Sequence, residues 1–339
     1  MIINNFNTNK KVMIVAEIGN NHEGNFKNAK KMIDLASKAG VDAVKFQTFK
    51  VEKFISENYD RKRFEKLKKF QLTYKEFKKL KKYTQKKKLL FISTPLDLDS
   101  ADFLSKISNI IKIASSDNNF FSLIKESLKK KKPLILSSGM ASDKEIKKTL
   151  TYIKKNVGLN FLKKNFALMH CVTSYPVDTK FVNLLSIPYL RKKFKLSIGY
   201  SDHTLGNDAC LAAVALGARI IEKHFTIDKK FSNFRDHSIS ADYYDLKKLV
   251  TSIRKIEIML GTNSKKIQTI ERPFLLSSRR AIYASKNIKR NSLLSYENID
   301  FLRPGPTTID LDYEKIINKR SKVFINKGSL IDVKNIAKK

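Results

Sequence analysis

Two histidines, His203 and His224, stand where their side chains could do chemistry. Each lies at the end of a short apolar run, in the segments GYSDHT (199–204) and IEKHFT (221–226). A β-strand would deliver such a side chain to the rim of a sheet, and two neutral imidazoles that meet there can hold a divalent metal ion. The pair alone is weak evidence, because a histidine in a folded protein more often has a structural role.

Two lysines, Lys45 and Lys112, lie inside runs of otherwise apolar residues. Burying an ammonium group costs free energy unless an anion accompanies it. Hydroxyl side chains follow neighbouring runs at Thr94, Ser115 and Ser137. Because cations and hydroxyls together are common ligands of phosphate and carboxylate, these residues predict a cradle for an anionic substrate.

The elements that must position these side chains are eight short β-branched runs, which alternate with longer helical patterns. The runs cover residues 12–18, 43–47, 89–93, 110–114, 133–137, 166–170, 196–200 and 219–223. Stretches between them, such as 28–38, 74–87 and 143–155, have apolar residues at helical spacing. This alternation predicts a (β/α)8 TIM barrel with its active site at the C-terminal ends of the strands. A doubly wound open sheet is the alternative, but its Gly-rich phosphate fingerprint is absent.

The pattern changes after the helical stretch 246–260. Short strands are expected at 280–285, 299–302 and 322–325, separated by turn-forming segments. We therefore predict a barrel domain at 1–262, a polar linker at 263–278 and a small, mostly β domain at 279–339.

The charge of this 339-residue chain is strongly positive, with 68 Lys and Arg against 32 Asp and Glu and a net charge of +36. The lysines are scattered over the whole length, without a basic tail or interleaved aromatic residues, so we expect no nucleic-acid partner. No apolar run approaches the ~20 residues of a membrane span. Cys171 and Cys210 are too few for a disulfide framework, and a cytoplasmic, reducing location fits them. The alternative interpretation of the charge is that the protein binds anions or nucleic acid and has no catalytic activity.

The order and spacing of these motifs resemble sialic acid synthases, the phosphoenolpyruvate-dependent nonulosonate synthases with a C-terminal antifreeze-like (SAF) domain. The resemblance runs nearly end to end and rests on the two histidine segments together with AEIGNNHEG (16–24), VKFQT (44–48), ISTP (92–95), KIAS (112–115), LSSGM (136–140), HCVTSYP (170–176) and LRPG (302–305).

The resemblance implies that phosphoenolpyruvate condenses with the open-chain aldehyde of a 2-acetamido sugar. Phosphate leaves by C–O cleavage, and the product is a nine-carbon 2-keto acid. N-acetylmannosamine is the expected sugar, with a 2,4-diacetamido-2,4,6-trideoxyhexose, which would give a legionaminate- or pseudaminate-type acid, as the alternative. The sequence departs from the family pattern at Thr173, where some members have Asn, and before Asp236, where several have Gly-Pro. Both departures concern segments that face the sugar.

The resemblance also assigns roles to residues. His203 and His224 would bind a divalent ion, Mn²⁺ or a substitute such as Mg²⁺ or Co²⁺, which polarises the aldehyde; Asp202 is an alternative ligand. The phosphoenolpyruvate site would comprise Lys45, Thr94, Lys112, Ser115 and Ser137, and the sugar site Gln47, Thr173, Tyr175, Ser201, Asp236 and Arg303. Glu17 would act as an acid or base, and Glu222 as a second base or a residue supporting the metal site. Arg303 would reach the barrel of a partner subunit, which implies a domain-swapped homodimer. A metal-dependent aldolase that uses free pyruvate remains a rival, distinguished by phosphate release.

Overall fold

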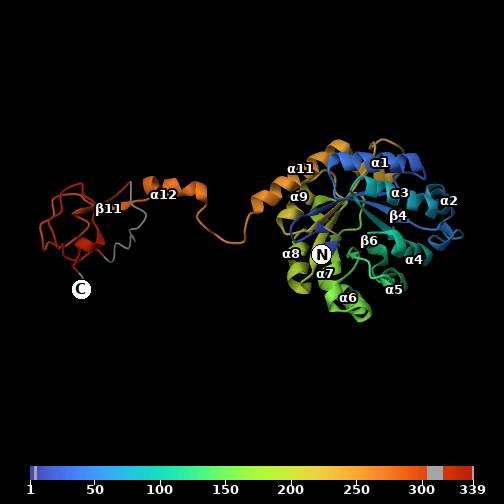
Figure 1. Cartoon of the computed structure of the whole chain (residues 1–339), viewed down its shortest axis with the longest axis horizontal. Coiled ribbons are helices and arrows are strands. Elements are labelled where there is room, and N and C mark those ends of the chain that lie inside the picture. The colour runs from blue at the N-terminus through green and yellow to red at the C-terminus, as the bar shows by residue number, and fades with distance from the viewer. Residues whose placement is uncertain (4–5, 304–315, 338–339) are drawn as a thin grey trace. The chain divides into compact units, whose positions relative to one another are not determined.

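A computed structural model describes residues 1–3, 6–303 and 316–337 (Figure 1). The chain divides into two compact units, Met1–Gly261 and Thr262–Lys339. No helix in the described ranges has the length and apolar character needed to span a bilayer.

The first unit is a closed barrel of eight parallel strands, which confirms the predicted fold. The strands are β3 (Met13–Gly19), β4 (Ala43–Thr48), β5 (Leu90–Pro95), β6 (Ile110–Ile113), β7 (Leu134–Ser137), β8 (Phe166–Cys171), β9 (Ser197–Asp202) and β10 (Ile220–His224). Each pairs with its neighbour in sequence, and β10 closes the barrel on β3, with His224 opposite Glu17.

Helices surround the strands (Figure 1). They are α1 (Phe26–Ala39), α2 (Arg61–Phe70), α3 (Tyr74–Lys86), α4 (Leu98–Ile107), α5 (Phe121–Leu128), α6 (Asp143–Val157), α7 (Leu159–Asn165), α8 (Ser186–Phe194), α9 (Asp208–Ala215), α10 (Arg235–Ile239) and α11 (Tyr243–Leu260), with the 3-10 turns η1 (Val51–Lys53), η2 (Ser115–Asp117) and η3 (Thr179–Phe181). Their starts are set locally: α6, for example, begins with a reciprocal capping box between Ser142 and Glu145. Their apolar faces and the outward side chains of the strands form the main core.

The barrel interior has a second, separate core at the N-terminal ends of the strands. It consists of Met13, Val15, Ala43, Ile92, Ile110, Ile135, Ala167, Met169 and Ile220, together with Met1 and Ile3. Met1 and Ile3 come from a short hairpin of β1 (Ile2–Ile3) and β2 (Phe6–Asn7), which the sequence did not predict. The hairpin therefore packs apolar side chains into the end of the barrel opposite the predicted active site.

The second unit contains η4 (Thr269–Glu271), α12 (Arg272–Ser278), the antiparallel strands β11 (Ala281–Ala284) and β12 (Ile299–Leu302), and η6 (Val333–Asn335). Two of its three predicted strands are confirmed. The strand predicted at 322–325 is wrong: of these residues only Ile325 is buried and bridged, to Ile288, whereas Val323 and Phe324 are exposed. The predicted linker includes η4 and α12. The LRPG segment continues into residues 304–305, which lie outside the described ranges.

Candidate active site

A cavity of about 660 Å³ opens at the C-terminal ends of the barrel strands. Every site residue predicted in the barrel lines it: Glu17, Lys45, Gln47, Thr94, Lys112, Ser115, Ser137, Thr173, Tyr175, Ser201, His203, Glu222, His224 and Asp236. Strand alternation explains the convergence of those on the strands, since residues two apart on a strand face the same side. Thr173 and Tyr175 follow β8, and Asp236 is on α10. Arg303 belongs to the second unit, where it is exposed.

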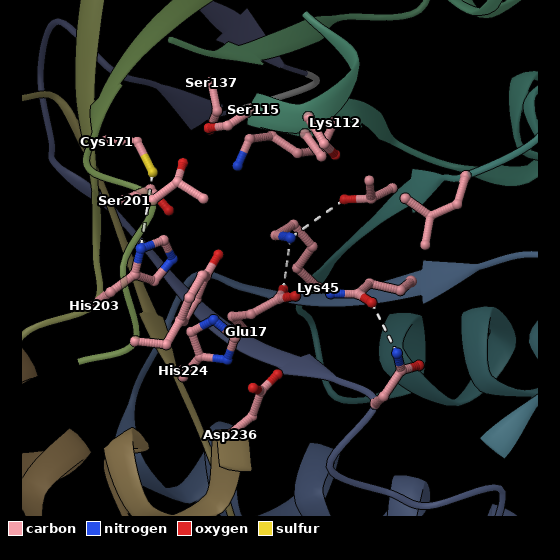
Figure 2. A pocket seen from close by; sticks show the side chains of 18 of the residues that line it. Glu17, Lys45, Lys112, Ser115, Ser137, Cys171, Ser201, His203, His224 and Asp236 are labelled. Atoms are coloured by element: carbon pink, nitrogen blue, oxygen red, sulfur yellow. Dashed lines mark hydrogen bonds and ion pairs between the residues drawn. The ribbon is translucent and has the colours of Figure 1, made fainter. Parts of the chain in front are cut away.

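Four ionisable side chains, two lysines and two glutamates, contact one another in the barrel interior. Figure 2 shows three of them, Glu17, Lys45 and Lys112. Lys45 Nζ lies 2.8 Å from Glu17 Oε2 and 3.7 Å from Glu222 Oε1. Lys112 Nζ lies 2.9 Å from both carboxylate oxygens of Glu222, which also accepts a hydrogen bond from Ser201 Oγ. The two lysines that predicted an anionic ligand therefore already have carboxylate partners. The sequence could not reveal this pairing, because Lys112 and Glu222 are 110 residues apart.

The two carboxylates of this quartet have opposite protonation behaviour. Burial raises the pKa of Glu17 to about 7, and Lys45 offsets only part of that effect. Burial also acts to raise the pKa of Glu222, but Lys112 and Lys45 outweigh it and lower that pKa to about 2. A carboxyl group that titrates near neutral pH is suited to proton transfer, whereas one with a pKa of about 2 is a weak base. Of the two carboxyl groups, Glu17 is the one whose pKa is raised towards neutral pH.

Hydroxyl groups lie near the two ammonium groups. Lys45 donates to Thr94 Oγ1 at 3.3 Å, and Gly139 N donates to Ser115 Oγ at 3.2 Å. Gly139 allows this approach because a Cβ there would lie 2.6 Å from Ser115 Oγ and 2.5 Å from Thr173 Oγ1. Figure 2 shows Lys112, Ser115 and Ser137 together at one end of the pocket, with His224 and Asp236 at the other.

The two predicted metal ligands lie side by side, with ring centroids 5.4 Å apart. His203 Nδ1 is 2.8 Å from the carbonyl oxygen of Val172. Because a carbonyl only accepts, Nδ1 carries a proton, which leaves Nε2 as the nitrogen that could bind a metal. Burial acts to lower the pKa of His203, but the Cys171 thiol and the Val172 carbonyl outweigh it and raise that pKa. Burial lowers the pKa of His224 to about 4, which keeps that ring neutral, and its Nδ1 is buried without a hydrogen-bond partner.

These features fit a divalent metal ion. Two imidazoles, one with its ring fixed by a carbonyl and one with an unsatisfied nitrogen, are suitable ligands, and substrate and water oxygens would complete the shell. Over the described ranges, no group of three or more His, Cys, Asp or Glu side chains is arranged to hold a metal. Asp202, the alternative ligand, is instead engaged by Lys223 at 2.6 Å, because the alternation of β9 turns it away from the cavity.

The cavity also has an aromatic and cationic wall that sequence reasoning missed. Its residues are Phe54, Arg63, Lys66, Leu67, Phe234 and Arg235, and Asn20 and Cys171 were also not assigned. Lys66 lies over the Phe234 ring at 4.8 Å, and the Arg235 guanidinium over the Tyr175 ring at 4.5 Å. Asn20 donates to Gln47 Oε1 at 2.8 Å. Much of this wall comes from the long connection between β4 and α3, whose only sequence signal is amphipathic spacing.

A closed parallel barrel with an ionisable cavity at the C-terminal ends of its strands places the protein in the class of TIM-barrel enzymes. A model of the NeuB family matches residues 32–265, and a SAF domain model matches residues 279–337. The chain belongs to the NeuB family, and the predicted resemblance to sialic acid synthases is confirmed.

Similar proteins cover nearly the whole chain. The N,N'-diacetyllegionaminic acid synthase of Campylobacter jejuni is 38% identical over 323 residues, which covers 91% of this chain and 96% of the relative. The pseudaminic acid synthase of that species is 35% identical and covers 98% of both chains. The crystal structure of an N-acetylneuraminic acid synthetase from Leptospira borgpetersenii superposes with a TM-score of 0.75 at 37% identity, covering 81% of this chain and 94% of that one.

Proposed function

We propose that this protein condenses phosphoenolpyruvate with the open-chain aldehyde of a 2-acetamido sugar, giving a nine-carbon 2-keto acid and phosphate. One observation carries the proposal: two lysines and several hydroxyls, which could form a cradle for an anion, line the same cavity as two histidines. A substrate with both a phosphate and a carboxylate suits the cradle. A substrate with a carbonyl oxygen suits the histidine side.

The chain's own groups can carry out most of this reaction. Lys45 and Lys112 would bind the anionic groups of phosphoenolpyruvate and exchange part of their contact with the carboxylates for contact with the substrate. Glu17, with a pKa of about 7, would hold or release a proton beside the reacting carbons. A divalent ion held by His203 and His224 would supply Lewis-acid polarisation of the sugar aldehyde.

Two sugars are candidates for the second substrate. N-acetylmannosamine follows from the resemblance to sialic acid synthases. A 2,4-diacetamido-2,4,6-trideoxyhexose is favoured by the names of the two Campylobacter relatives and by the apolar groups of the aromatic and cationic wall. Phe54, Leu67 and Phe234 line the cavity and would suit a methyl group at C6 better than a hydroxymethyl group.

The test is to incubate the purified protein with Mn²⁺, phosphoenolpyruvate labelled with ¹⁸O in the bridging position, and a panel of 2-acetamido sugars. We expect stoichiometric phosphate that contains the label, because C–O cleavage leaves the bridging oxygen with phosphorus. Condensation of free pyruvate without phosphate release would support the aldolase instead. Binding of RNA that weakens steeply with salt, without turnover of any sugar, would support the non-catalytic reading.

We also propose that Arg303 completes the site of a partner subunit in a homodimer. Its support is the family resemblance of the LRPG segment and the exposure of Arg303 within its own unit. The test is to mix inactive Arg303→Ala protein with inactive His224→Ala protein under conditions that allow subunits to exchange. If Arg303 acts across subunits, each mixed dimer has one intact site, so about a quarter of the wild-type activity should return. No recovery despite demonstrated exchange would place Arg303 in its own subunit's site or outside any site.

A further inference from the structure

A buried ion pair lies behind the two histidines, outside the barrel interior. Lys223 and Asp202 face each other on β10 and β9, in the same register position. Lys223 is between Glu222 and His224 in the chain, and Asp202 is between Ser201 and His203. Because side chains alternate along a strand, each member of the pair points away from the cavity that its neighbours line. Both side chains are almost inaccessible to solvent, at 2% and 0% exposure.

The pair is fully engaged in hydrogen bonds. Lys223 Nζ lies 2.6 Å from Asp202 Oδ2 and also donates to the carbonyl oxygen of Thr204. The other Asp202 oxygen accepts from Thr204 N and from the Tyr200 hydroxyl, both at 2.9 Å, and Cys210 of α9 donates its thiol to Oδ2. Both backbone polar groups of Thr204, the residue after His203, are thus attached to the pair.

Fold stability alone gives little reason for a charged pair at this position. Replacing a buried ion pair with apolar residues of similar volume is often neutral or stabilising. A satisfied ionic network does, however, fix geometry, because its groups have few alternative partners. Here that network joins the ends of the two strands that bear the imidazoles.

We propose that Lys223 and Asp202 are positioning residues that set the spacing of His203 and His224 for a divalent metal ion. This inference rests on the metal site of the proposed function. The pair holds Thr204 on one side of His203 and, through the β9–β10 register, the backbone beside His224. His203 is fixed at its ring as well, by the Val172 carbonyl, so the pair and that carbonyl together define where its free nitrogen lies.

The experiment measures Mn²⁺ binding to the metal-free protein, without substrate, by titration calorimetry and by the electron paramagnetic resonance signal of free Mn²⁺. Lys223→Met should raise the Kd for Mn²⁺ by about 10- to 100-fold, the range typical of residues that orient metal ligands. Asp202→Asn, which keeps the side-chain volume and an acceptor for Thr204 N, should act in the same direction and guards against misfolding of the first variant.

The matched control is Arg254→Met. Arg254 also makes a part-buried ion pair, with Asp42, but that pair ties α11 to the segments before β3 and β4 at the other end of the barrel. The control should lose thermal stability while its Kd for Mn²⁺ stays within about twofold of wild type. Wild-type Mn²⁺ affinity in folded Lys223→Met or Asp202→Asn would overturn the role of the pair. Failure of the wild type itself to bind Mn²⁺ would instead refute the metal site, and the inference with it.

Discussion

The two ends of the barrel interior are built from the same strands but differ completely in chemistry. At the N-terminal ends the inward side chains are apolar, as at Val15 and Ile110; one inward position further along, the same strands present Glu17 and Lys112. Two residues of strand separate the layers by only about 6–7 Å. The apolar layer buries surface without any polar cost, whereas the polar layer holds four ionisable groups whose charges must compensate each other. The residues that stabilise the barrel and the residues that could carry out chemistry therefore form adjacent layers on the same strands.

The largest loss of activity should come from removing the imidazole of His224 from the polar end of the barrel. We expect His224→Ala to lower metal-dependent phosphate release by ~10³-fold or more, since Lewis-acid stabilisation contributes several kcal/mol to such reactions. The fold should survive, because Nδ1 of this ring has no hydrogen-bond partner to lose. Steady-state phosphate assays and circular dichroism measure the two quantities.

A matched control for that variant is His170→Ala. His170 is also buried and on a barrel strand, but it bonds to the Val182 carbonyl at 2.8 Å and does not line the main cavity. We expect lower stability with phosphate release per folded molecule within about tenfold of wild type. Equal losses of activity in both variants would mean that His224 acts through general packing rather than as a ligand.

The next largest effect is expected between two variants of β7, one with a substitution in each layer. Ile135→Ala should lower the free energy of unfolding by about 2–5 kcal/mol, because Ile135 is fully buried in the apolar layer. Ser137→Ala, one inward position along, should change stability by less than about 1 kcal/mol and instead raise the KM for phosphoenolpyruvate. Urea unfolding and initial rates distinguish the two. A Ser137→Ala variant as unstable as Ile135→Ala would abolish the proposed division between layers.

The barrel and most of its cavity could be predicted from sequence because both depend on local periodicity. Short β-branched runs at regular intervals define the strands, and the last inward residue of each strand lies at the cavity by geometry alone. Gln47, Ser137 and His224 were found in this way, with the resemblance adding their roles.

What sequence reasoning missed depends on contacts between distant segments. The partner of Lys112 is 110 residues away, and only barrel closure brings Glu222 to it. The wall residues Arg63 and Lys66 look like any exposed helical cations, since nothing local marks which face of α2 borders the cavity. The hairpin of β1 and β2 has strands of only two residues, which is too short for periodicity to detect. The interpretation of 322–325 as a strand failed because apolar composition does not reveal exposure.

The smallest expected effect is the pH dependence that Glu17 contributes to the free energy of unfolding. It measures most directly how much free energy the burial of an ionisable group in the polar layer costs. The pKa of Glu17 is raised from the ordinary value of 4.5 to about 7 in the folded protein, chiefly by burial. Between these values the folded protein holds a proton that the unfolded chain has lost, so the contribution of Glu17 to stability should fall as pH rises from about 5 to 7, by about 1 kcal/mol per pH unit. Glu17→Gln lacks this contribution, and its stability relative to wild type should therefore increase with pH over that window.

The difference between the two proteins isolates Glu17 because the remaining buried groups are common to both. Glu222, whose pKa is lowered to about 2, loses its stabilising contribution only as pH falls below about 4.5, outside the window. The buried histidines titrate in the unfolded chain near 6.5, but their effect cancels in the comparison. Urea unfolding at pH 5, 6 and 7 supplies the measurement. A difference that stays constant with pH would mean that Glu17 is ionised throughout, and that Lys45 compensates its charge as fully as Lys112 compensates that of Glu222.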